Sequence, residues 1–489
     1  MSVIVRTQSG DVRGKFAQGV AEFLGIPYAA PLDRGRRFAA PQPPRPWPGV
    51  RDALEFSAAP PQAPPPGPQP AVWSPGDSTE SLCVNVWTPE PAGSGLPVFV
   101  WIHGGAFLSG TASMPGYHGA GLAAAGQVVV TLNYRVAFEG FGWLPDAPAN
   151  RGILDQIAAL RWIQDNISAF GGDPGNVTIG GESAGGASVA ALLAAPPARG
   201  LFRRASVQSA SSRFLDVAEA RRVTDIIAAE LGLPASAAAF DEVAPERIHE
   251  VQHAPVAVMA QDRRAWTMAE AITPYYPVID GTVLPQAPWH ALRAGASRDV
   301  DLIAGFTRDE YAPFAEMQGL ADADPAAVAH DLRLPASAVE DYRAGKPGIA
   351  DSALIVDMMS DSLFRMSSLW CAESHAEAGG RTYLYEVTWD GTPFGACHGI
   401  DIPLVFGNVD DDAAPFPMLF GGGLEGLDDF AALSAYVRKS WTSFAASGDP
   451  GWPQYRLDTR LTRLLGSPVA TVADPEAVSR RVWEPCYRA

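Results

Sequence analysis

The chain has 489 residues, of which 47% are hydrophobic and 18% are charged. This composition is typical of a folded globular protein and excludes a disordered one. The formal net charge at pH 7 is -18, which repels the phosphates of nucleic acids and the head groups of anionic lipids. We therefore do not expect nucleic acid or a membrane surface as a partner.

The N-terminus and the cysteines both favour a reduced, cytoplasmic protein. The first residues, MSVIVRTQSGDVRG, lack the apolar core and the cleavage site of a secretory signal. No apolar run approaches the roughly 18 residues needed to span a bilayer. The cysteines are too scattered for a disulfide scaffold and lack the spacing of a metal site; they are Cys83, Cys371, Cys397 and Cys486. Removal of a leader would leave the same pattern.

Residues 41–76 give the densest loop signal, because proline at this frequency excludes a helix and a central strand. A flexible linker between two domains is one interpretation. Both sides of the segment have the pattern of a sheet, so we expect a long surface loop that wraps around one domain.

Three short, valine-rich stretches follow, at residues 82–89, 96–105 and 127–135. Their hydrophobicity is continuous, as expected of strands covered on both faces. In residues 152–172, apolar residues recur every three or four positions, which predicts a helix with Gly171 as its C-cap. The strand-like stretch 176–181 completes a crossover unit. The pattern predicts an α/β fold with a mostly parallel sheet and helices on both faces.

The second half of the chain reads mainly as helices, at residues 212–300 and 312–380. Two strand-like stretches, at 299–306 and 381–389, interrupt them. We expect the helical regions to form the walls of a pocket within a single domain of residues 1–489.

The stretch from Gly181 to Gly185 reads Gly-Glu-Ser-Ala-Gly and fits the pattern G-x-S-x-G. A strand that turns abruptly into a helix strains one residue, and small neighbours two positions away prevent a collision. Ser183 is therefore the candidate nucleophile, and the N–H of Ala184 would point at a reacting carbonyl. The pattern alone also occurs in inert glycine turns.

A second source of backbone N–H groups is WIHGGAF at residues 101–107, which follows a predicted strand. Gly104 and Gly105 permit a close approach of the backbone to an oxyanion. Each such donor stabilises a transition state by about 3 kcal/mol. The alternative is a glycine turn that only ends the strand.

A serine nucleophile needs a histidine base and an orienting carboxylate, in the chain order serine, acid, histidine. His398 lies in a glycine-flanked loop after the stretch at 381–389, and we predict it as the base. The other histidines that follow Ser183 read as parts of helices or their connections; they are His249, His253, His290, His330 and His375. Asp309 and Glu310 both follow the stretch at 299–306, and either could be the acid or pair with Arg308.

Together these motifs resemble the type-B carboxylesterases, which are α/β-hydrolases. The resemblance runs from FLGIPYAAP near the start through VWIHGGAF, GGESAGG, AGFTRDE and CHGIDIPLVFG to SFAASGDPGWPQY. It implies Glu310 as the acid beside Ser183 and His398, and an oxyanion hole made by the N–H groups of Gly105, Ala106 and Ala184. It also implies hydrolysis of small carboxylic esters through an acyl-enzyme, with no metal and no organic cofactor.

The chain departs from this family in having no cysteine before Cys83, so the N-terminal disulfide of the secreted members is absent. Glu182 has two interpretations: a charge that attracts cationic substrates, or a buried carboxylate that supports the turn. The Gly-Gly-Ala loop suggests activity on esters of bulky or tertiary alcohols. Aromatic residues that could touch substrate are Phe107, Trp266, Phe306, Tyr311, Phe314 and Phe364.

Three other functions fit parts of the sequence. The same machinery can hydrolyse carbamates or amides. A non-catalytic binding protein on this fold would typically lack the serine or the histidine, and here both are present. GGGLEG at residues 421–426 fits the dinucleotide pattern G-x-G-x-x-G, but prolines precede it and no crossover unit surrounds it. We expect a loop there instead.

Overall fold

The computed structural model describes residues 1–64, 71–91, 93, 95–262, 266–409, 424 and 427–488. In these residues one sheet of 13 strands has the order β1-β2-β3-β5-β7-β6-β8-β9-β10-β11-β12-β13, with β4 beside β2. The strands are β1 (Ser2–Arg6), β2 (Asp11–Ala17), β3 (Val20–Pro27), β4 (Val50–Asp52), β5 (Cys83–Thr88), β6 (Leu96–Ile102), β7 (Val128–Leu132), β8 (Gly172–Glu182), β9 (Arg204–Gln208), β10 (Asp301–Thr307), β11 (Thr382–Val387), β12 (Leu461–Leu465) and β13 (Ala470–Ala473).

The centre of the sheet is parallel and its two ends are antiparallel. Every neighbouring pair from β7 to β12 is parallel. The strands from β1 to β7 pair antiparallel along the order, as do β12 and β13. The predicted, mostly parallel sheet is confirmed, with antiparallel additions at its ends.

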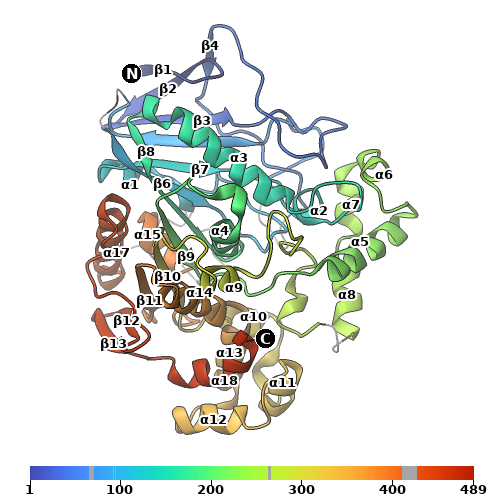
Figure 1. Ribbon diagram of the computed structural model, residues 1–489, viewed down its shortest axis with the longest axis vertical. Helices are drawn as coiled ribbons and strands as arrows, with labels where there is room; N and C mark the ends of the chain where they lie inside the picture. The colour runs from blue at the N-terminus through green and yellow to red at the C-terminus, as the bar shows by residue number, and fades with distance from the viewer. Residues whose placement is uncertain are drawn as a thin grey trace.

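Both faces of the central part of the sheet are covered, which explains why a central strand such as β6 is continuously apolar. In β6, Val98, Val100 and Ile102 belong to one buried core. Phe99 and Trp101, which alternate with them, belong to a second core on the other face. The helices α3 (Arg151–Asn166) and α4 (Ala184–Ala194) supply residues to the first core, and α17 (Asp428–Ser447) supplies residues to the second (Figure 1).

The amphipathic stretch at 152–172 forms α3 and a short 3₁₀ turn, Ile167–Phe170. Gly171 follows with φ +89°, the left-handed conformation of a helix C-cap, as predicted. Within the segment of residues 41–76, β4 pairs parallel with β2, and the Trp47 N–H donates to the Ser9 carbonyl. This part of the segment therefore lies on the same sheet.

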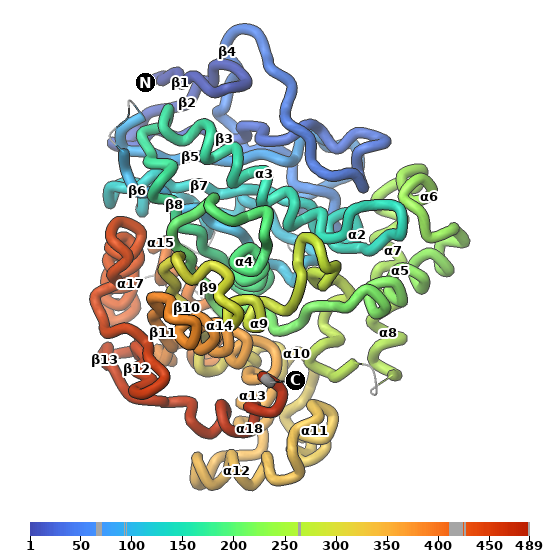
Figure 2. The backbone as a smooth tube through the Cα atoms, in the orientation of Figure 1, coloured from blue at the N-terminus to red at the C-terminus, as the bar shows by residue number. Residues whose placement is uncertain are grey.

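Most other helices lie in residues 212–300 and 312–380. Figure 2 shows α5 to α8 gathered at one side of the molecule and α11 and α12 at one end. That these helices wall the pocket remains a prediction. The stretch GGGLEG lies outside the described residues except for Leu424. The helices are α5 (Val217–Leu231), α6 (Ala237–Asp241), α7 (Pro245–Val251), α8 (Ala254–Gln261), α9 (Pro288–Arg293), α10 (Ala312–Met317), α11 (Pro325–Asp331), α12 (Ala338–Gly345), α13 (Asp351–Ser360) and α14 (Met366–Glu377).

Candidate active site

The candidate residues follow the strands β6, β8, β10 and β11, which run parallel to one another. The carboxyl ends of these four strands therefore lie at the same edge of the sheet. Ile102 of β6 pairs with Gly181 of β8. Thr307 of β10 pairs with Val387 of β11. Residues that follow these four strands, directly or within the next loop, therefore meet at the edge where open α/β sheets bind ligands.

Ser183 forms the sharp turn between β8 and α4. Its backbone has φ +61° and ψ -123°, a strained combination for a residue with a side chain. The chain packs tightly around it, since a Cβ at Gly185 would lie 2.1 Å from the Ile102 carbonyl oxygen. The strained turn predicted from G-x-S-x-G is therefore present, and Ser183 itself is only partly buried.

The HGGAF loop lies against this turn. A Cβ at Gly104 would meet the Cβ of Ser183 at 3.1 Å. Gly105 and Ala106 have φ +117° and +54°, so the loop has an irregular backbone. Within the described part of the chain, the N–H groups of Gly105, Ala106 and Ala184 donate to no protein acceptor. Three free donors beside a serine hydroxyl are what an oxyanion hole requires.

His103 holds the backbone of the HGGAF loop in place. Its Nδ1 lies 2.8 Å from the Gly104 carbonyl oxygen, and its ring stacks on Tyr134 at 4.3 Å between centroids. The Tyr134 hydroxyl donates to the His103 carbonyl at 2.7 Å. Burial lowers the pKa of His103 to about 4, so the ring is neutral at physiological pH and acts as a support.

Glu310, and not Asp309, faces His398. The Glu310 Oε2 lies 2.6 Å from Nδ1 of His398, and its Oε1 accepts the Thr307 N–H at 2.8 Å. The Asp309 carboxylate instead pairs with Arg308 and accepts the Ala396 N–H at 2.9 Å. The structure thus separates two adjacent carboxylates whose roles residue chemistry left open.

The other imidazole nitrogen faces the serine turn. Nε2 of His398 lies 3.0 Å from Oε1 of Glu182, the residue before Ser183. This is a contact between charges without the alignment of a hydrogen bond. The Ser183 side chain does not cap a backbone N–H of α4. His398 therefore lies between Glu310 and the turn that carries the hydroxyl.

Burial and neighbouring charges shift the pKa values of His398 and Glu182. Burial lowers the pKa of His398, but the charges of Glu182 and Glu310 outweigh it and raise that pKa to about 9. Burial raises the pKa of Glu182 to about 8. Perturbed, interacting pKa values in one place are typical of functional sites.

Asp401 is the residue of this cluster that the sequence interpretation missed. It lies three positions after His398 at the start of α15 (Asp401–Phe406), and burial raises its pKa to about 7. The Tyr385 hydroxyl donates to it at 3.0 Å. The sequence signal that could have indicated Asp401 is its position three residues after His398.

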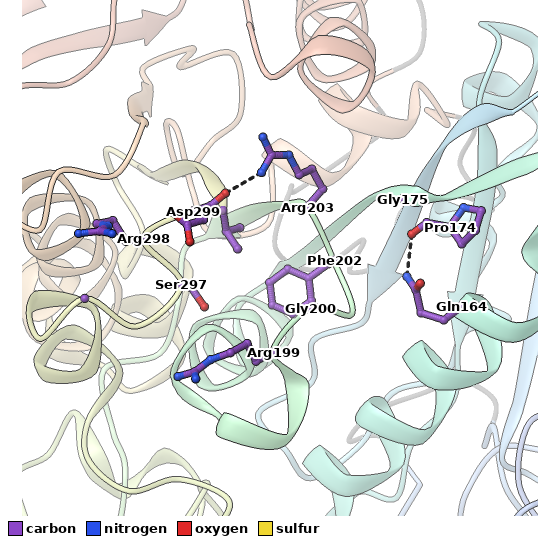
Figure 3. Close-up of a pocket in the computed structure, with 12 residues that line it drawn as sticks. Gln164, Pro174, Gly175, Arg199, Gly200, Phe202, Arg203, Ser297, Arg298 and Asp299 are labelled. Carbon is purple, nitrogen blue, oxygen red and sulfur yellow. Dashed lines mark hydrogen bonds between the residues drawn. The ribbon is translucent and has the colours of Figure 1, made fainter.

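A separate pocket of about 630 Å³ lies at the opposite edge of the sheet. Its lining includes Arg203 and Val300, which directly precede β9 and β10. Arg203 donates to the Asp299 carbonyl at 3.0 Å. The guanidinium groups of Arg199, Arg203 and Arg298 do not converge on one point (Figure 3). No candidate site residue lines this pocket.

Comparison with known proteins identifies the family. The model of the carboxylesterase family matches residues 1–464. This chain belongs to the carboxylesterase family. It is similar to the para-nitrobenzyl esterase of Bacillus subtilis (strain 168), with 35% identity over 98% of each chain. It is also similar to the phenmedipham hydrolase of Pseudarthrobacter oxydans, with 32% identity over 96% of each.

Solved carboxylesterase structures show the same fold. A carboxylesterase from Geobacillus stearothermophilus matches with a TM-score of 0.85 and 32% identity, over 98% of this chain and 99% of that one. A para-nitrobenzyl esterase structure matches with a TM-score of 0.81 and 34% identity, over the same shares. The α/β-hydrolase fold and the activity of a carboxylic-ester hydrolase, both implied by the resemblance, are confirmed.

No group of three or more His, Cys, Asp or Glu side chains in the described residues is arranged to hold a metal ion. None of their helices combines the length and the apolar character needed to cross a membrane.

Proposed function

We propose that this carboxylesterase uses Ser183, His398 and Glu310 as its catalytic triad, and the N–H groups of Gly105, Ala106 and Ala184 as its oxyanion hole. The observation that supports this most is the position of His398. One ring nitrogen lies 2.6 Å from Glu310, and the other faces the strained turn that carries Ser183.

In the proposed mechanism, Nε2 of His398 takes the proton of the Ser183 hydroxyl as its oxygen attacks the ester carbonyl. Glu310 accepts from Nδ1–H, which fixes the tautomer and stabilises the imidazolium. The carbonyl oxygen becomes an oxyanion, which the backbone donors hold. His398 then protonates the departing alcohol, and water repeats the sequence on the acyl-enzyme.

In this mechanism Glu182 is a second carboxylate next to the His398 imidazolium. Its side chain is only 1% exposed, which supports the interpretation as a buried carboxylate over that of an exposed attractor for cations. When His398 carries its second proton, the charge of Glu182 stabilises it across 3.0 Å. In the neutral state, Nε2 is available to Ser183.

The proposed substrates are small carboxylic esters, including those of bulky alcohols. Relatives named for para-nitrobenzyl ester and phenmedipham hydrolysis guide the choice of compounds. Carbamate or amide hydrolysis is the second candidate, because the same triad chemistry performs it. A cytoplasmic location and the exclusion of nucleic acid as a partner remain predictions from composition.

A substrate panel tests the function. The compounds are para-nitrophenyl acetate, para-nitroacetanilide, phenmedipham, and the ethyl and tert-butyl acetates. We expect fast release of para-nitrophenol with a pre-steady-state burst, and slower or no release from the anilide. Ser183→Ala should abolish all turnover, while Ser74→Ala, on an exposed loop, should not. Turnover of the anilide above the ester, or residual ester turnover in Ser183→Ala, would contradict the proposal.

A further inference from the structure

The edges and the faces of the His398 ring are held by different groups. Its two nitrogens lie 2.6 Å from Glu310 and 3.0 Å from Glu182. One face is covered by Phe364, with 4.0 Å between ring centroids and 28° between ring planes. Phe314 is farther away and tilted, at 5.6 Å and 57°. Phe364 is therefore the ring that limits rotation of the imidazole out of its plane.

Phe364 lies in an irregular turn of the long helical segment that contains α13 and α14. Between α13 and α14, residues Asp361–Arg365 form a π-helical turn, which we call the π-turn. The Met366 N–H donates to the Asp361 carbonyl five residues before it, where an α-helix would use the carbonyl of Ser362. A π-turn holds one residue more than an α-turn and often occurs at functional sites.

The π-turn is fixed to the loop after β9. The Ser362 carbonyl, which has lost its α-helical partner, accepts from the Ser212 hydroxyl at 2.6 Å. The Leu363 carbonyl accepts the Ser212 N–H at 2.8 Å. At the start of the same loop, the Gln208 carbonyl accepts the Ser183 N–H at 3.0 Å. The loop after β9 thus connects the π-turn to the turn at Ser183.

The π-turn is also fixed to the loop that carries Glu310. Arg365 is fully buried, pairs with Asp361 inside the π-turn, and donates to the Arg308 carbonyl at 2.5 Å. On the preceding turn, the Ser360 hydroxyl accepts the Tyr311 N–H at 3.0 Å. The two points of attachment, Arg308 and Tyr311, lie two residues before Glu310 and one residue after it. A shift of the π-turn would therefore move the acid and Phe364 together.

We propose that Phe364 is a positioning residue for His398 and that the π-turn is the device that holds it there. The phenyl ring keeps the imidazole in plane with Glu310, and its π-face stabilises the imidazolium that forms during acyl transfer. This inference rests on the proposed function, in which His398 is the base. It differs from a role as a wall of the pocket, because it acts on every substrate alike.

Four variants of the full chain test the proposal, with para-nitrophenyl acetate, butyrate and octanoate. Phe364→Leu removes the ring and keeps apolar bulk, and Phe364→Tyr keeps the ring. Phe240→Leu is the matched control, since Phe240 is a fully buried ring that packs on Phe38 and Phe138 instead. Phe364→Met replaces Phe364→Leu if that variant does not fold.

For Phe364→Leu we expect kcat to fall roughly 3- to 10-fold, the size of one lost aromatic pair, by the same factor for all three esters. The imidazolium loses the ring face, so the pKa of His398 should fall and the acid limb of kcat/KM should move to lower pH by roughly half a unit. The far-downfield proton resonance of Nδ1–H should broaden. Phe364→Tyr and Phe240→Leu should keep the wild-type kcat, pH limb and resonance.

Two results would overturn this inference: a loss confined to one acyl length with an unmoved pH limb, or behaviour of Phe364→Leu identical to that of Phe240→Leu. Labelling with a phosphonate ester separates this from failure of the proposed function. If the wild-type chain is not labelled at Ser183, the triad assignment fails. If Ser183 is labelled and Phe364→Leu is unchanged, only the positioning role fails.

Discussion

Glu182→Gln tests whether buried charge beside His398 controls the pH dependence of catalysis. The substitution nearly preserves the shape of the side chain and removes its charge. The carboxylate is 1% exposed and lies 3.0 Å from Nε2 of His398. Solvent therefore screens this contact little, and the effect of the charge should be large.

The magnitude follows from the pKa of His398. Burial lowers it, yet the charges of Glu182 and Glu310 raise it from 6.5 to about 9. This net rise corresponds to about 3 kcal/mol in favour of the charged form. An opposite charge at this distance shifts a pKa by about one to three units, so removal of the Glu182 charge should lower the pKa of His398 by about one unit.

The sign follows from the role of the base. In the proposed mechanism His398 must be neutral to accept the Ser183 proton, so we expect kcat/KM to rise as pH increases through the pKa of the imidazole. Burial also raises the pKa of Glu182 to about 8. The acid limb of the wild-type kcat/KM profile therefore reports the joint titration of Glu182 and His398. Glu182→Gln leaves one titrating imidazole, and we expect the acid limb to move to lower pH by about one unit.

The assay is the pH profile of kcat/KM for para-nitrophenyl acetate between pH 6 and 10.5, with spontaneous hydrolysis subtracted, so that the profile extends past the wild-type limb. The control is Glu22→Gln, which removes a carboxylate 3.1 Å from His118, a side chain that is 44% exposed. This control should leave the profile unchanged. A Glu182→Gln limb that coincides with the wild-type limb, or lies at higher pH, would refute the reasoning.

Three further predictions concern the triad, the oxyanion loop and the core. Glu310→Gln should keep the fold and lower kcat by about 10⁴, because the amide oxygen stays with the Thr307 N–H and the uncharged NH2 group then faces Nδ1 of His398, which favours the wrong imidazole tautomer; a loss below tenfold in steady-state assays would contradict that role. Gly105→Ala should lower kcat by about 10² to 10³ with little change in KM, because a Cβ there would lie 2.1 Å from the Ser109 carbonyl oxygen; an unchanged kcat would remove this loop from the mechanism. Arg135→Met should lower the free energy of unfolding in urea by about 3 to 5 kcal/mol, because it leaves Asp155 charged and buried; equal midpoints and slopes for the two proteins would contradict it.

Local patterns predicted most of the sheet and the sharp turn at Ser183. The strands β5, β6 and β7 are short and almost wholly buried, and the nearly continuous apolar pattern that predicts them depends only on burial of both faces. G-x-S-x-G is equally local, since the collisions that small residues prevent occur within one turn. These features needed no knowledge of the tertiary structure.

The choice between Asp309 and Glu310 needed three-dimensional contacts. Both follow β10 and both carry the same group. What separates them is the Ala396 N–H, which holds Asp309 from a loop 87 residues away. Residue chemistry could not supply this contact, and the family resemblance alone selected Glu310.

The surroundings of His398 were the least predictable part. Glu182 left two interpretations open until its burial was known. Phe364 was a candidate for substrate contact and not for stacking, because the extra residue of the π-turn is invisible in a helical pattern. A change of one residue in helical register decides which side chain faces the imidazole.

The account depends most on Ser183 being the nucleophile. The most direct measurement is inactivation with diethyl para-nitrophenyl phosphate, followed by intact-mass analysis and peptide mapping of the wild-type chain and Ser183→Ala. We predict one diethylphosphoryl adduct per chain, on the peptide that contains Ser183, with loss of activity in proportion to labelling, and no adduct in the variant. Inactivation with the adduct on another residue, or full activity after labelling of Ser183, would contradict the account.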